Sequence, residues 1–241
     1  MIVQNRKVYA DAYDLSGYLS AVEFEAGLES QDDTVFGDGA RSSVAGLDTA
    51  TLVEEGIWDA GAGLPDTVLW SQRGLAGVLA TFAPVNGNEG SLAYFMRTTQ
   101  GLYAPGAQVG EILRFSVELS ASGDYGAIRG TVMSTGAKTA TGNSTKRQLG
   151  AVSATQKLYA GLHVLSVSGS SPTIDVTVRS DADSSSGSET TRITFAQQTA
   201  VGSVWATPVA GAITDEWWDV RVVIGGSSTP TFGIVVVVGI Q

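Results

Sequence analysis

Alternation of apolar and polar residues runs through most of this chain and predicts antiparallel strands. Segment 22–28 separates apolar from acidic positions: Val22, Phe24, Ala26 and Leu28 lie on one face, and Glu23 and Glu25 on the other. Segment 113–120 repeats the pattern: Leu113, Phe115, Val117 and Leu119 lie on one face, and Arg114, Ser116, Glu118 and Ser120 on the other. A period of two with a single apolar face is typical of a half-buried strand.

A second strand is expected where Leu52 and Val53 lead into the acidic pair Glu54–Glu55. The segment between the two strands, Gln31 to Asp48, is polar, contains glycine and is too long for a hairpin turn. We therefore expect a surface loop there, and loops of this length usually have a function. The acidic pairs Asp32–Asp33 and Glu54–Glu55 fit solvated positions, because nothing in their spacing joins them to the aromatic cleft that a glycosidase needs.

The rest of the chain adds one helix and many short strands. Pro65 opens a helix that the pattern extends to Leu75, since proline suits the first helical turn. Further strands are expected at 77–84, 91–100 and 125–134, the first two joined through the turn dipeptide Asn86-Gly87. After an aperiodic stretch, strands recur at 158–167, 173–180, 190–197, 217–224 and 231–240, which is typical of a β-sandwich or jelly roll.

These patterns predict a mainly β protein with one flanking helix and a C-terminal, jelly-roll-like β-sandwich domain. The segment 135–155 is rich in small residues and has no periodicity, so it is expected to be a linker or an exposed loop. The predicted domains are therefore a β domain at 1–134 and the sandwich at 156–241. A second, diverged copy of the first domain is the alternative reading of the C-terminal half.

Composition narrows the function. The chain has 14 Lys plus Arg against 24 Asp plus Glu, a formal charge of −10, which disfavours tight wrapping of nucleic acid but suits a wall along which DNA passes without sticking. Cysteine is absent, so neither a disulfide framework nor a thiolate metal site exists. No signal peptide is recognised, and the apolar run at 232–240 is too short to cross a bilayer. We expect a soluble protein, made in a cytoplasm, with no membrane partner.

Catalytic chemistry finds little support. The single histidine, His163, lies within a strand pattern and is expected to be a packed side chain. No G-x-S-x-G or phosphate-binding glycine motif occurs, so we expect no enzyme activity, no cofactor and no metal. Segment 181–189 is similar to a calcium loop, but its glycine comes one place late and Arg192 stands where the bidentate acid should be. A solvated hairpin tip explains the same residues.

Two adjacent tryptophans mark a candidate ligand or packing face near the C-terminus. Trp218 alternates with apolar residues and is expected in the core. Trp217, Asp219 and Arg221 then share the opposite face, which could bind a sugar or pack against a neighbouring subunit. A second sheet covering that face is the competing interpretation.

The stretch 13–59 resembles the opening of long-tailed phage (siphophage) tail tube proteins. The resemblance rests on DLSGYLS at 14–20, DTVFGDGA at 33–40, the small-residue step AGL at 45–47 and the strand that follows. It covers roughly the first half of the chain and contains no catalytic signature. It implies that 1–134 is a tail-tube-like β-barrel or sandwich domain.

The resemblance also implies a role. A tail tube protein is a virion structural subunit that forms rings with copies of itself, and the rings stack into a conduit through which DNA passes on genome delivery. Its partners are itself and other tail proteins, with only transient, non-specific passage of DNA. Candidate lumen-facing residues are Glu23, Glu25, Ser116, Glu118 and Ser120. Candidate inter-subunit loop residues are Asp32, Asp33, Phe36, Asp38 and Arg41. The alternative is a capsid decoration or tail appendage protein that binds host carbohydrate or a receptor through its C-terminal sandwich.

Overall fold

The fold of the chain is described from a computed structural model, which covers residues 5–36, 39–123, 125–185 and 187–241. It is mainly β with one helix in this described part, which confirms the predicted fold class. The elements are β1 (Lys7–Ala10), β2 (Tyr13–Asp14), β3 (Leu19–Asp32), β4 (Ser43–Ile57), α1 (Pro65–Gln72), β5 (Ala76–Ala83), β6 (Leu92–Gly106), β7 (Arg114–Ala121), β8 (Ile128–Lys138), β9 (Gly142–Asn143), β10 (Arg147–Gln148), β11 (Lys157–Asp181), β12 (Thr190–Thr194), β13 (Gly202–Trp205), β14 (Val209–Ala210) and β15 (Trp217–Ile240).

The chain forms two compact units, and each combines segments that are distant in sequence. Unit 1 comprises residues 1–17, 78–95 and 128–241, and unit 2 comprises 18–77 and 96–127. The units thus divide the predicted first domain, whose beginning and end both belong to unit 1. The predicted linker at 135–155 holds the end of β8 together with β9 and β10, which both pair with β15.

Unit 2 is built on an antiparallel sheet in the order β3-β4-β7-β6. Its core face carries Leu52 of β4 and the apolar positions of β7, which pair in register as Leu52↔Leu119 and Glu54↔Val117. Helix α1 is anchored on this face through Asp66, whose carboxylate accepts hydrogen bonds from Tyr103 Oη at 2.7 Å and Trp58 Nε1 at 3.0 Å. The predicted helix is confirmed and begins at Pro65 as expected, but it ends at Gln72 instead of Leu75.

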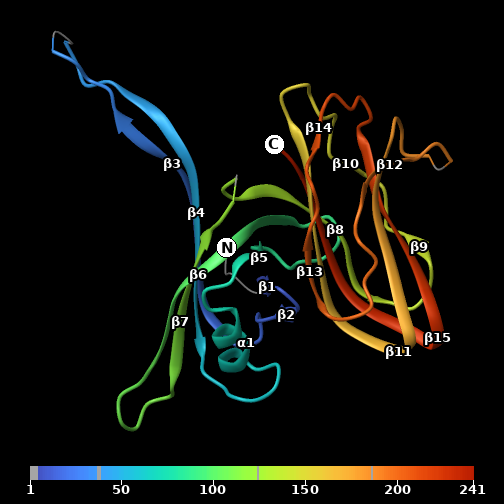
Figure 1. Cartoon of the computed structure of the whole chain (residues 1–241), viewed down its shortest axis with the longest axis horizontal. Helices are drawn as coiled ribbons and strands as arrows, with labels where there is room; N and C mark the ends of the chain where they lie inside the picture. Colours follow the sequence, from blue (N-terminus) through green and yellow to red (C-terminus); the bar gives the residue numbers. More distant parts are fainter. Residues whose placement is uncertain (1–4, 37–38, 124, 186) are drawn as a thin grey trace. The chain divides into compact units, whose positions relative to one another are not determined.

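Strands β3 and β4 continue beyond this sheet as a two-stranded ribbon (Figure 1, blue). The predicted loop between Gln31 and Asp48 is therefore wrong at its two ends, since pairs such as Gln31↔Val44 and Leu28↔Asp48 extend the ladder, and it holds for the described residues between Asp32 and Ser43. An extra residue of β4 is accommodated between Leu28 and Ser30, where the register shifts. This β-bulge interrupts the alternation that would have identified a strand in the sequence. We call the described residues 27–36 and 39–49 the ribbon.

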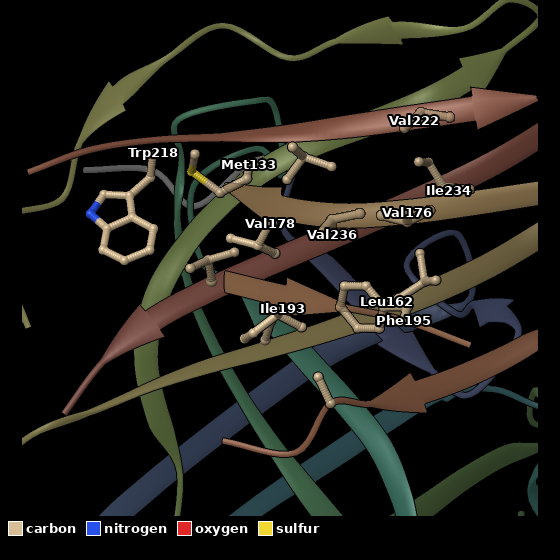
Figure 2. Packing of buried hydrophobic residues seen from close by; sticks show 14 of the residues in the cluster. Met133, Leu162, Val176, Val178, Ile193, Phe195, Trp218, Val222, Ile234 and Val236 are labelled. Atoms are coloured by element: carbon tan, nitrogen blue, oxygen red, sulfur yellow. The ribbon is translucent and has the colours of Figure 1, made fainter. Parts of the chain in front are cut away.

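Unit 1 is organised by the two longest strands, β11 and β15, which pair antiparallel from Leu158↔Ile240 to Asp181↔Trp217. Each was expected as two separate strands, but each is continuous and bends at its middle. Ser171, Ser228 and Thr229 have positive φ at these bends, and the register shifts nearby. Both halves of each strand contribute to one apolar core, which is the core of a sandwich (Figure 2). That core includes Leu162, Val176, Val178, Trp218, Val222, Ile234 and Val236.

Candidate assembly surface

The face of the unit 2 sheet that points away from the core is acidic. Cross-strand register places Glu23 beside Val53 and Val53 beside Glu118, so these two carboxylates lie in one row. The next row aligns Glu25, Thr51 and Ser120, and the row on the other side aligns Ala21, Glu55 and Ser116. We call this surface, with Glu23, Glu25, Glu55, Glu118, Ser116 and Ser120, the acidic face. All five predicted lumen-facing residues belong to it.

The carboxylates of the acidic face take part in no ion pair with the residues that the structure describes. Glu23, Glu25 and Glu55 are exposed, and Glu118 is half-buried. The ion pairs found in the described part of the chain all involve other acids: Asp14, Glu89, Asp181, Glu189, Asp219 and Asp215. Like charges on one sheet face repel one another, and this face therefore presents a negative potential to whatever lies in front of it.

Strand β3 forms an open edge of the same sheet. It is 14 residues long and has β4 as its partner on one side, while no strand of the described chain pairs with its other side. An edge of this length exposes a row of backbone N–H and C=O groups that can pair with another chain. A two-stranded ribbon such as the one that continues this edge is also marginally stable by itself in water.

The end of the ribbon is held by short-range hydrogen bonds. Asp32 Oδ1 accepts from the backbone N–H of Thr34 at 2.9 Å, and hydrogen bonds from the Thr34 hydroxyl and amide lower the pKa of Asp32. Asp33 accepts a hydrogen bond from the Ser42 hydroxyl, and its own N–H donates to the Ser42 carbonyl at 3.2 Å. Phe36 and Arg41 are exposed. Of the predicted loop residues, Asp38 lies outside the described residues.

The candidate ligand face in unit 1 is largely occupied by the protein itself. Trp217, Asp219 and Arg221 do share one face of β15, as predicted. Asp219 is buried, however, and accepts two hydrogen bonds from the Arg179 guanidinium, the first from Nε at 2.9 Å. Arg221 Nη1 is 3.4 Å from Asn143 Oδ1. Because its carboxylate is already paired, this face does not favour a sugar-binding function.

The loop that was compared with a calcium site is closed by a lysine. The ammonium group of Lys146 donates to Asp181 Oδ2 at 2.6 Å and to the Ser185 carbonyl, and lies 3.3 Å from Glu189 Oε1. The hydrogen bond from Lys146 lowers the pKa of Asp181. A side-chain cation thus occupies the position between these oxygens. No cluster of three or more acids or histidines in the described residues could hold a metal ion.

Glu54 is the residue that sequence reasoning placed wrongly. It was expected to be solvated, but its side chain has no exposed surface, and no group among the residues that the structure describes hydrogen-bonds to either carboxyl oxygen. Burial raises the pKa of Glu54 to about 8. The signal was present in the sequence: Glu54 is two residues from Leu52, so both side chains must project from the same face of a strand.

His163 is a structural side chain of unit 1. Its Nδ1 is 2.7 Å from the Asp11 carbonyl oxygen and must donate to it, which leaves Nε2 to accept from the Thr81 hydroxyl at 2.8 Å. Burial lowers the pKa of His163 to about 4, so the ring is neutral. Tyr9 packs against the ring with centroids 5.7 Å apart.

No helix in the described part of the chain has the length and hydrophobicity needed to span a bilayer.

Comparison with known proteins gives only distant similarities. No protein-family model and no curated protein matches the chain. Among solved structures, a chain of the native gene transfer agent virion is 8% identical over 51% of this chain and 95% of its own, with a TM-score of 0.40. The SPP1 Dit protein, described as a hub adsorption apparatus of phages that infect Gram-positive bacteria, is 9% identical over 99% of this chain and 100% of its own, with a TM-score of 0.39.

A third structure, the sheath/tube terminator of an extracellular contractile injection system, is 14% identical over 54% of this chain and 95% of its own, with a TM-score of 0.39. Similarities this distant carry no functional argument. The function is therefore argued from the chain's own residues.

Proposed function

We propose that this chain is a structural protein of a phage-type tail, and that it is the subunit from which the rings of the tail tube are built. The observation that carries the proposal is the unit 2 sheet, which combines an unneutralised acidic face with an open edge 14 residues long. The resemblance of residues 13–59 to tail tube proteins supports the same function. The role of the chain is to assemble into the tube and to let DNA pass through it, without turnover of a substrate.

The open edge provides the lateral contact. In a ring, β3 of each subunit pairs with the sheet of its neighbour, and closure of the ring leaves no edge exposed. A closed barrel of this kind satisfies the backbone groups that the isolated subunit leaves to water.

The acidic face provides the lumen. With β3 and β4 in the ring wall, the face that carries Glu23, Glu25 and Glu118 points to the central channel. DNA phosphates bind to cationic surfaces and release counterions there, whereas an acidic wall gives them no site at which to stop. The virion is the place of function, after synthesis in the host cytoplasm.

Electron microscopy with an edge variant tests the proposal. Purified wild-type protein should form rings or tubes in negative stain, and light scattering should give a mass of several subunits. Leu28→Lys places a charge on the open edge of β3, where lysine blocks pairing, and should leave only monomers. Val201→Lys is the matched control, because Leu28 and Val201 are 62% and 52% exposed and neither substitution disturbs a core. Wild-type protein that remains monomeric at high concentration contradicts the proposal.

A further inference from the structure

Exposed apolar side chains gather at two ends of unit 2. Nine of the fifteen exposed large apolar side chains in the described part of the chain lie there, five on the ribbon and four at the end of the β6–β7 hairpin. Those on the ribbon are Leu28, Val35, Phe36, Val44 and Leu47. Those at the hairpin end are Ile57, Val109, Ile112 and Leu113. We call residues 107–113, with Ile57, the β6–β7 tip.

The ribbon and the β6–β7 tip lie at opposite ends of the same sheet. Strand β4 runs from the ribbon to Ile57, and Ile57 pairs with Arg114, the first residue of β7. The backbone N–H of Trp58 then donates to the Leu113 carbonyl at 3.0 Å, which places the end of β4 directly beside the tip (Figure 1). A second copy displaced along the strand direction would therefore bring its ribbon to the tip of the first.

We propose that the β6–β7 tip of one copy binds the ribbon of the next copy along the tube axis. This inference rests on the proposed ring-forming function and identifies the surface through which rings stack. Such a contact joins two different patches, so it repeats without closing and produces a filament of rings. When the contact forms, the apolar side chains of both patches are removed from water, and this burial supplies the main stabilisation of the contact.

The charges of the two patches favour contact between a ribbon and a tip over contact between two ribbons. The ribbon carries Asp32 and Asp33 together with Arg41, and the tip carries Glu111 with Arg114 next to it, all exposed. Two ribbons that met each other would bring two pairs of aspartates together. A ribbon on a tip allows Arg114 to face the aspartates and Arg41 to face Glu111, and complementary charges of this kind select the correct partner and register.

Mixing two variants tests the contact. The ribbon variant carries Val35→Ser and Phe36→Ser, and the tip variant carries Val109→Ser and Ile112→Ser. All four positions are exposed, so the subunit should fold normally. Each variant alone should form single rings that do not stack. An equal mixture should form pairs of rings, because one intact tip and one intact ribbon remain between unlike rings. Val201→Ser should stack like the wild type.

The outcomes separate this contact from the proposed function. If ribbons bind ribbons, the tip variant alone will form paired rings and the mixture will add nothing, and the contact is then wrong. Rings that stack equally well in both variants also overturn it, while leaving the ring-forming function intact. A wild-type chain that forms no rings overturns both. As a second test, Glu111→Arg should abolish stacking and Arg41→Glu in the same chain should restore it.

Discussion

Glu54 offers the sharpest test of the physical reasoning, because a buried carboxyl without a partner must make stability depend on pH. The side chain projects from β4 between Val22 of β3 and Val117 of β7, its cross-strand partners in register. Neither neighbour can donate a hydrogen bond to it. Desolvation alone therefore raises the pKa of Glu54 from 4.5 to about 8.

The size of the effect follows from linkage. Below pH 4.5 the carboxyl is protonated in both the folded and the unfolded chain, and it costs nothing through ionisation. As pH rises, the unfolded chain ionises first, so the free energy of unfolding falls by about 1.4 kcal/mol per pH unit until the folded group ionises near pH 8. Between pH 5 and pH 8 unit 2 should lose about 3 kcal/mol.

Glu54→Gln removes this titration while it keeps the size and shape of the side chain. Hydrogen exchange in peptides from β4 and β7, measured in urea at pH 5 and pH 8, should show the wild-type loss and a much smaller loss in the variant. The neighbouring Glu55→Gln is the control, because Glu55 is exposed and its removal should leave the wild-type pH dependence in place. The reasoning is refuted if Glu54→Gln and the wild type lose stability equally between the two pH values.

Two further predictions concern unit 1. The pKa of His163 in the folded chain, about 4, lies below its ordinary value of 6.5. The neutral ring therefore contributes fully to the free energy of unfolding above pH 6.5, and about 3 kcal/mol of that free energy is lost as the pH falls towards 4. His163→Gln should therefore flatten the acid side of a urea-unfolding profile, and an unchanged profile would show that the ring is not buried as described. Gly130→Ala should destabilise by about 1–3 kcal/mol, because a Cβ there would lie 2.3 Å from the Val238 carbonyl oxygen. Gly142→Ala, with open space around it, should leave the thermal midpoint unchanged, and equal shifts in the two variants would contradict the packing of β8 on β15.

The alternation of residues was sufficient to identify most strands and their faces. Val117 and Leu119 point to the core and Ser116 and Glu118 away from it, as the period of two requires. The same rule could have placed Glu54, whose burial is set by the parity of Leu52. It was missed because an acidic pair was interpreted by residue type instead of by position.

Pairing between distant segments could not be predicted, because it depends on contacts that local periodicity does not encode. The bulge in the ribbon disrupts the period of two, so the alternation predicts a loop at 31–48, although β3 continues to Asp32 and β4 begins at Ser43. The division into units was missed for a related reason. β1 pairs with β5, and β8 with β15, so that unit 1 takes strands from the predicted first domain, 1–134. The division of the chain into two units depends on which whole strands pair with one another.

The stability of the proposed ring depends on two opposing free energies of similar size, the gain from lateral hydrogen bonds and the cost of association. An edge of 14 residues turns about half of its backbone N–H and C=O groups outward, so pairing with a neighbour along its whole length adds roughly 14 hydrogen bonds. At a net contribution of about 1 kcal/mol each, one lateral joint supplies at most about 14 kcal/mol. Association costs about 4–15 kcal/mol in lost motion, and the acidic faces of neighbouring subunits repel one another. An open arc of subunits is therefore barely stable. Closing the ring adds one more joint without ordering another subunit, and for this reason monomers and closed rings should both outnumber open arcs.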